Sequence, residues 1–199
     1  MKISLTTVLF LLSLTACSQQ KIPAADWQIK TAVLAVEEEY REGAKVYGYD
    51  ANGEFTVLRE GTNQYICLAD NPAKEGFETA GYHKDLEMFM ARGRELKAQG
   101  KGAKEIFDIR EEEVKNGSLK MPERATLNVF NGNLNEQTNE IEDQRIRYVV
   151  YIPFATPEST GLPVKPRAQG HPWIMNPGTH RAHIMITPTY PKNNEDEKK

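Results

Sequence analysis

Residues 45–69, KVYGYDANGEFTVLREGTNQYICLA, contain three short runs of the β-branched and aromatic residues that favour strands. The runs cover residues 45–49, 54–59 and 64–69. Asn52-Gly53 separates the first run from the second, and Gly61-Thr-Asn63 separates the second from the third. Both compositions are typical of tight turns. This spacing predicts three consecutive antiparallel strands, each paired with the next one along the chain.

Helical patterns lie on both sides of these strands. Before them, Asp26 is a candidate N-cap for a helix that runs to about Tyr40, with Ile29, Val33 and Val36 on one face. After them, apolar residues recur at helical spacing over 82–98 and 103–115. Gly100-Lys-Gly102 separates these two helices, and Asn116-Gly117 ends the second.

The C-terminal third returns to strand patterns. Residues 125–130, 144–152 and 181–187 are predicted strands, and the segment 132–143, rich in Asn and Glu, is the predicted loop between the first two. Residues 153–177 are rich in proline and predicted to be irregular. Strands, then helices, then strands predict an α+β fold with a mostly antiparallel sheet and helices packed on one face.

The composition fits one globular domain over residues 26–189. The chain has 199 residues and a formal net charge of −3, and its basic residues are scattered. This distribution gives no electrostatic footprint for a nucleic acid. The last ten residues, 190–199, mix both charge signs and are predicted to be a disordered tail.

The N-terminus carries an export signal. Lys2 precedes an apolar run centred on residues 8–12, which is too short to span a bilayer. The run ends in Leu14-Thr-Ala-Cys17, which resembles the lipobox of bacterial lipoproteins. That resemblance implies cleavage of a signal peptide, 1–16, and attachment of diacylglycerol and fatty acyl chains such as palmitate to Cys17. Residues 17–25 would then be a lipidated tether. The expected location is the bacterial cell envelope, and Ser18 after Cys17 favours the outer membrane facing the periplasm.

Histidine and methionine side chains gather between residues 171 and 185. One hypothesis is a site for a small ligand or an envelope partner, formed by His171, Trp173, His180 and His183 between the sheet and the proline-rich segment. A second hypothesis is a copper site, because imidazole and thioether groups suit copper. Its ligands would be His171, Met175, His180, His183 and Met185. The alternative is that these side chains fill the core and bond to the backbone.

Cys67 supports a third hypothesis, a cysteine-dependent enzyme with His83 or His183 as the base. A catalytic thiol needs an exposed, electropositive setting. Cys67 lies instead in the apolar run Tyr65-Ile-Cys-Leu-Ala69, which favours core packing. No catalytic motif appears elsewhere in the sequence, and this favours a binding protein over an enzyme.

Several short motifs resemble those of a loose group of secreted or lipidated bacterial proteins of unknown function. They are Arg41-Glu-Gly-Ala-Lys-Val46, Glu60-Gly-Thr-Asn63, Cys67-Leu-Ala-Asp70, the helix after Tyr82 and Ala182-His-Ile-Met185. The resemblance implies no activity, cofactor or site residue. It does draw attention to the Cys67 region and to the Ala-His-Ile-Met strand.

Overall fold

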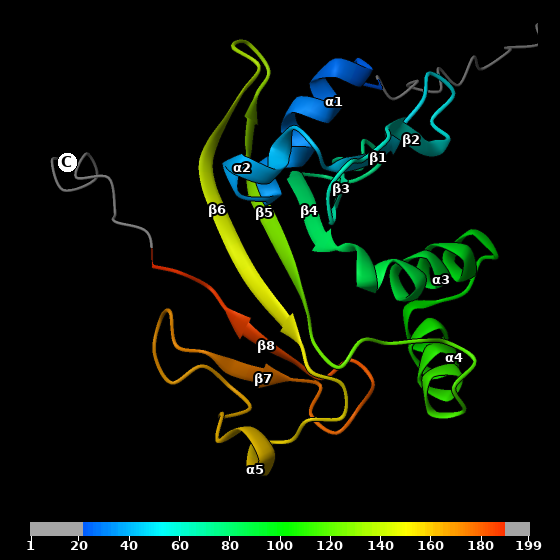
Figure 1. Ribbon diagram of the computed structural model, residues 1–199. Helices are drawn as coiled ribbons and strands as arrows, with labels where there is room; N and C mark the ends of the chain where they lie inside the picture. Colours follow the sequence, from blue (N-terminus) through cyan, green and yellow to red (C-terminus); the bar gives the residue numbers. More distant parts are fainter. Residues whose placement is uncertain (1–21, 190–199) are drawn as a thin grey trace, which may run out of the picture.

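The computed structural model describes residues 22–189, which form seven helical segments and one eight-stranded sheet (Figure 1). The helices are α1 (Ala25–Ala32), η1 (Val33–Ala35), α2 (Glu38–Arg41), η2 (Lys84–Leu86), α3 (Glu87–Ala98), α4 (Ala103–Lys115) and α5 (Pro157–Thr160). The strands are β1 (Lys45–Tyr49), β2 (Phe55–Arg59), β3 (Tyr65–Leu68), β4 (Phe77–His83), β5 (Ala125–Asn135), β6 (Glu140–Tyr151), β7 (Trp173–Met175) and β8 (His183–Ile186). The mostly antiparallel α+β fold is confirmed.

The predicted series of three consecutive antiparallel strands is wrong at its last step. The sheet order is β2-β1-β3-β4-β5-β6-β8-β7. β1 and β2 form the expected antiparallel hairpin. β3, however, lies on the other side of β1 and runs parallel to it, with Val46 opposite Cys67.

The loop after β2 explains this crossover. It passes across the start of β1, where the amides of Thr62 and Asn63 donate to the Gly43 carbonyl at 2.8 and 3.1 Å. A Cβ on Gly61 would lie 2.6 Å from the Lys45 nitrogen, so the close approach depends on glycine. The chain therefore enters β3 at the same end as β1, and the two strands run parallel.

The N-terminal helix is shorter than predicted. Ala24 is the N-cap of α1, and Asp26 lies in its first turn without capping it. Val36 adopts an extended conformation, with φ −126° and ψ 159°, which ends η1. Ile29, Val33 and Val36 still pack in one cluster, as the spacing predicts.

The predicted start of the central helix at Tyr82 is also wrong. Tyr82 lies in β4 and pairs with Ile66 of β3 and Leu127 of β5. The chain turns at His83, whose Nδ1 accepts the Asp85 amide at 3.3 Å and caps η2. The following helices, α3 and α4, end where the sequence predicts.

Residues 132–143 form the outer half of a long β5–β6 hairpin, and not the predicted loop. Figure 1 shows this hairpin as the two longest strands of the molecule. The Asn133 amide donates to Asp143 at 2.8 Å, and the Asn135 amide donates to Glu142 at 2.7 Å. The polar composition therefore belongs to an exposed cross-strand ladder, closed by a turn with Asn139 at φ 57°.

The proline-rich segment is more regular than predicted. It contains α5, which Thr156 caps in a reciprocal pair of hydrogen bonds with Ser159. It also contains β7, which pairs antiparallel with β8. This pairing places Met175 opposite His183. The predicted final strand, 181–187, corresponds to β8, which is shorter at both ends.

Helices cover both faces of the sheet, where the sequence predicts only one. Ile66 and Cys67 are neighbours on β3, so their side chains point to opposite faces. Ile66 packs in the core cluster that contains Phe89 of α3. Cys67 packs in a second cluster with Val36, beside α1 and η1. A strand that is buried on both faces needs cover from both sides, so the helices divide between them.

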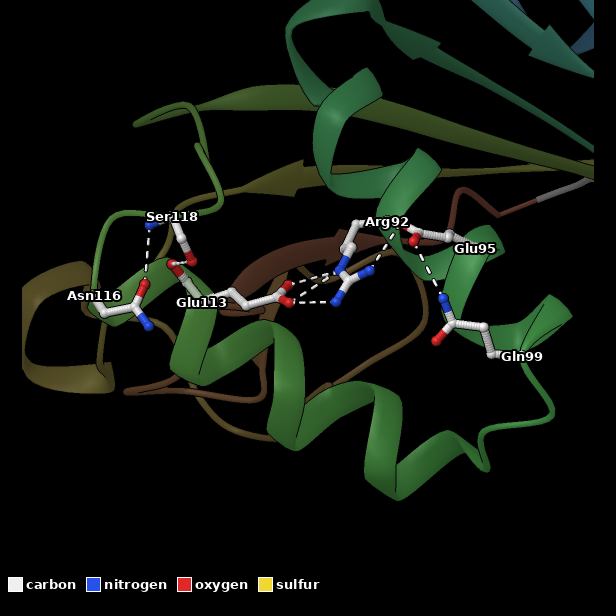
Figure 2. A network of polar contacts seen from close by, with 6 residues as sticks. All are labelled: Arg92, Glu95, Gln99, Glu113, Asn116 and Ser118. Carbon is white, nitrogen blue, oxygen red and sulfur yellow. Dashed lines mark hydrogen bonds and ion pairs between the residues drawn. The ribbon is translucent and has the colours of Figure 1, made fainter.

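A polar network joins α3 to α4 (Figure 2). The Arg92 Nε donates to both carboxylate oxygens of Glu113 at 3.0 Å, and Glu95 accepts from Arg92 at 2.8 Å. At the end of α4 the Ser118 amide donates to the Asn116 side chain at 2.9 Å. The Arg92–Glu113 pair therefore connects the two helices.

No helix between residues 22 and 189 is long and apolar enough to cross a membrane. The predicted signal peptide 1–16, Cys17 and the predicted tail 190–199 lie outside the described residues. The last part of the predicted tether is joined to the domain, because Gln28 donates to the Pro23 carbonyl at 2.8 Å.

Candidate functional site

A cleft of about 790 Å³ lies between the sheet and the C-terminal half of α3. Strands β1 to β5 and the segment 69–76 supply most of its lining, and α3 supplies Arg94, Lys97 and Ala98. Small-molecule sites usually have volumes of about 300–1,000 Å³. The cleft therefore has the size of a ligand site.

One wall of the cleft is aromatic. Phe55 opposes Tyr49 in the β1–β2 ladder, and the two rings meet edge to face with centroids 5.4 Å apart. Phe55 also stacks on Tyr47 at 5.4 Å with an interplanar angle of 12°. Phe55 is one of the few large apolar residues exposed in the described chain. Its ring offers a flat apolar surface to a ligand.

The neighbouring wall is cationic. The Arg94 guanidinium lies 5.6 Å from the centre of the Phe55 ring, and Lys97 lines the cleft one turn later on α3. Arg94 donates to Glu87 at 2.6 Å and to the Tyr82 hydroxyl at 3.1 Å. A guanidinium has five N–H donors. Within residues 22–189, three of those of Arg94 therefore have no hydrogen-bond partner.

A partly buried network holds Arg94 in place. The Tyr82 hydroxyl donates to one Glu87 oxygen at 2.5 Å, and the Tyr47 hydroxyl donates to the other at 3.2 Å. Tyr82 is fully buried, and burial raises the pKa of its phenol. It therefore remains a neutral donor. Glu87 thus connects the aromatic wall to the cationic wall before any ligand arrives.

A third wall is acidic. The half-buried Asp70 accepts the Glu78 amide at 2.9 Å, and the Glu78 carboxylate accepts the Asn131 amide at 2.9 Å. No cation in the described chain forms an ion pair with Asp70. Burial raises the pKa of Asp70. Burial and the nearby Asp70 charge also raise the pKa of Tyr49, which places the acidic wall beside the aromatic one.

Known proteins give no guide to this arrangement. No family model, curated protein or solved structure matches the chain.

The ligand residues predicted from the sequence lie at the other end of the sheet, around β7 and β8. His171 and Trp173 line a second pocket of about 360 Å³, together with Thr187 and the loop 166–170. His180 and His183 are not part of its lining. The structure therefore brings together two of the four predicted ligand residues.

His180 lies in the packing between α4 and the loop before β8. It is fully buried, and its Nδ1 lies 3.3 Å from a Glu111 oxygen. Its ring meets Phe107 at 4.7 Å and Phe89 at 5.5 Å between centroids. Burial lowers the pKa of His180. These contacts are those of a neutral core histidine.

His183 is also buried, but in a different place. Its Nδ1 lies 2.6 Å from the Arg181 carbonyl, and its ring packs at 5.3 Å on Tyr151. Burial lowers its pKa as well. His180 and His183 therefore have separate sets of contacts, and the two imidazoles do not share a ligand cavity.

The proposed copper ligands are only partly assembled. Met175 and His183 face each other across β7 and β8, and Met175 is exposed. Met185 is buried in the main core, His180 points to Glu111, and His171 is exposed at the second pocket. Within the described part of the chain, no group of three or more His, Cys, Asp or Glu side chains is placed to hold a metal ion.

Cys67 has the properties of a packing residue. Its side chain is fully buried in β3, in the cluster with Val36. Burial raises the pKa of the thiol to about 12, so it stays protonated at neutral pH. His83, one proposed base, pairs with Asp85 at 3.4 Å. Nucleophilic cysteines need the opposite setting, a lowered pKa and access to solvent.

Acidification is expected to destabilise the fold through His180 and His183. Burial lowers both pKa values below the ordinary value of 6.5, so the unfolded chain takes up protons first. The stability that these groups contribute is complete above about pH 6.5 and is lost as the pH falls towards their folded-state pKa values. Chemical denaturation between pH 8 and pH 5 measures this loss. A chain with both His180→Gln and His183→Gln should lose less stability over the same pH range.

The control for this experiment is His171→Gln, because His171 is exposed. It should keep the wild-type dependence on pH. The charged groups that face the two buried imidazoles are Glu111, Arg110, Arg181 and Arg147. Hydrogen bonding to Lys115 lowers the pKa of Glu111 below 4.5, so Glu111 is protonated only below the pH range of this experiment. If the double variant lost stability with falling pH as steeply as the wild type, His180 and His183 would not be the cause of the acid destabilisation.

Sequence reasoning misses the cleft. Its important residues, Phe55, Asp70 and Arg94, come from β2, the segment after β3 and α3. Asp70 and Arg94 lie in two of the short motifs described above, but that resemblance implies no site residue. One signal is present in the sequence: Tyr47 and Tyr49 alternate along a strand and face Phe55 across the Asn-Gly turn. This pattern places three rings on one face of a hairpin.

Proposed function

We propose that this chain is a lipid-anchored protein of the bacterial cell envelope whose globular domain binds a small organic ligand in the cleft. The anchor is inferred from Leu14-Thr-Ala-Cys17, and the expected site is the outer membrane facing the periplasm. If a Cys17→Ser chain still incorporated labelled palmitate, the anchor at this cysteine would be wrong. The binding function is inferred from the cleft.

The cleft supports ligand binding through its size and its preformed walls. It has more than twice the volume of the pocket at His171 and Trp173. An apolar ring surface lies between charged groups of both signs, and the Glu87 network already orders the cationic wall. A site that is ordered before binding loses less conformational entropy when the ligand arrives.

Binding is favoured over catalysis. The lining contains no Ser, Cys or His among the described residues. Cys67 and the buried His180 and His183 lie outside the cleft, so the cysteine–histidine pair considered from the sequence does not form there. The charged side chains of the walls can orient a ligand through hydrogen bonds and ion pairs.

The experiment is ligand capture by the lipidated protein. The chain, purified in a mild detergent, is incubated with the small-molecule extract of the cells that produce it and examined by native mass spectrometry. We expect a bound compound on the wild type. Ala98→Trp should remove it, because Ala98 lines the cleft and a tryptophan there occupies the cavity.

The matched control is Ala103→Trp, an exposed alanine at the start of α4 that does not line the cleft. This variant should keep the bound compound. Circular dichroism checks that both variants are folded. A compound that survives Ala98→Trp binds elsewhere, and a wild-type protein that captures nothing contradicts the proposed function.

A further inference from the structure

We infer that the cleft takes a zwitterion of peptide type, with its carboxylate at Arg94 and Lys97, its ammonium at Asp70 and Glu78, and its apolar part against Phe55. This inference rests on the proposed function, since it names the ligand class for the same cleft. It goes beyond that function by assigning each wall to one chemical group.

The walls follow one another in a fixed order. Arg94 lies over the Phe55 ring at 5.6 Å, and Phe55 meets Tyr49 at 5.4 Å. Tyr49 is close enough to Asp70 for the carboxylate charge to act on its phenol. Asp70 in turn bonds the Glu78 amide at 2.9 Å. Positive charge, aromatic surface and negative charge therefore follow one another around the cleft.

The cationic end is suited to a carboxylate. Glu87 accepts one Arg94 hydrogen bond and so balances part of the charge, but three N–H donors remain without a protein partner in residues 22–189. Lys97 adds a second positive charge, and the described residues give it no ion pair. A guanidinium binds a carboxylate through two parallel hydrogen bonds. An anionic group of the ligand would use the donors that the protein leaves open.

The acidic end is suited to an ammonium. Asp70 is half-buried, and its Oδ1 already accepts the Glu78 amide. Its carboxylate forms no ion pair within residues 22–189, although the charge of the exposed Lys74 acts on it. A partly buried carboxylate without a positive partner is unfavourable. A primary ammonium supplies three N–H donors, enough to reach Asp70 and the Glu78 carboxylate together.

Other ligand classes leave one end unsatisfied. A simple anion would pair with Arg94 and add negative charge to a cleft that already holds Asp70 and Glu78. A neutral compound would leave Lys97 and Asp70 without an ion-pair partner. The segment 69–76 does not change the net charge of the lining through Lys74 and Glu75, because these two residues carry one charge of each sign. A zwitterion matches both ends at once.

The test uses free dipeptides with apolar side chains: alanyl-phenylalanine, phenylalanyl-alanine and leucyl-alanine. Isothermal titration calorimetry of the full lipidated chain, in matched detergent, compares each with its N-acetylated, C-amidated and doubly capped forms. We expect each single cap to weaken binding at least about tenfold, since each removes one charge-assisted contact. The doubly capped forms should bind most weakly.

Two conservative variants assign the ends. Asp70→Asn keeps an oxygen for the Glu78 amide but removes the charge, so N-acetylation should then have little further effect. Lys97→Gln changes an exposed side chain, so C-amidation should have a smaller effect in that variant. The crossed combinations, amidated peptide with Asp70→Asn and acetylated peptide with Lys97→Gln, should keep the full loss and serve as controls.

The outcomes separate the two proposals. If capped and free dipeptides bind equally, and Ala98→Trp abolishes both, the cleft is a ligand site but the zwitterion assignment is wrong. If no dipeptide binds while the captured compound of the native protein lacks an ammonium or a carboxylate, the assignment is again wrong. If neither dipeptides nor captured compounds respond to Ala98→Trp, the cleft itself is not the binding site.

Discussion

Replacing Phe89 by alanine is expected to lower the free energy of unfolding by about 3–5 kcal/mol, the usual range for a buried Phe. Phe89 is 1% exposed and packs where α3 meets the sheet and the His180 loop. Its ring meets Tyr151 at 6.1 Å and His180 at 5.5 Å, and the Arg110 guanidinium stacks on it at 4.0 Å. Removing the ring leaves a cavity and withdraws a cation–π partner from a buried arginine.

Urea denaturation measures this effect, and Met88→Ala is its control. Met88 precedes Phe89 on α3 but is 54% exposed, so its removal should change the stability by less than about 0.5 kcal/mol. Phe89→Leu should fall between the two, because leucine fills part of the cavity. Similar losses of stability for Met88→Ala and Phe89→Ala would show that α3 does not pack against the sheet through the face that contains Phe89.

Glu87→Ala is expected to lower the free energy of unfolding by about 2–4 kcal/mol, because hydrogen bonds to charged groups contribute about 1.5–3 kcal/mol each. Glu87 accepts from Tyr82, Tyr47 and Arg94. Its loss leaves a buried hydroxyl without its acceptor and a partly buried guanidinium without its counter-charge. Because the network also holds Arg94, the same variant should weaken ligand capture by the cleft.

The matched control is Glu105→Ala. Glu105 forms an exposed pair with Lys101 four residues earlier, and such pairs contribute about 0.3–0.5 kcal/mol. Its removal should be nearly silent in denaturation and in ligand capture. Equal effects for Glu87→Ala and Glu105→Ala would contradict the network, and a stability loss with normal capture would make Glu87 structural only.

Local sequence signals determine several elements directly. The Asn52-Gly53 turn and its flanking residues specify the β1–β2 hairpin, since the turn conformation requires Gly53 at φ 82°. Gly102 and Asn116 bound α4, as helix-breaking residues at both ends predict. In each case residues that are adjacent in the sequence are sufficient to specify the element.

Other elements are decided between distant residues. Gly61 and Asn63 suit a tight hairpin as well as the observed crossover, and only the contact with Gly43 makes β3 parallel to β1. Tyr82 fits a helical spacing, but pairing with Ile66 and Leu127 places it in a strand. Backbone hydrogen bonds between strands outweigh a weak local preference.

The candidate site shows the same division. The sequence by itself determined the α+β class, the hairpin of aromatic residues, the extent of α4 and the C-terminal end of α3. Only the tertiary structure decided that Phe55, Arg94 and Asp70 line one cavity, and that His180 and His183 are buried apart from each other. The physical reason is that periodicity fixes the face on which a side chain lies. Its neighbours across the cleft depend on how separate elements pack.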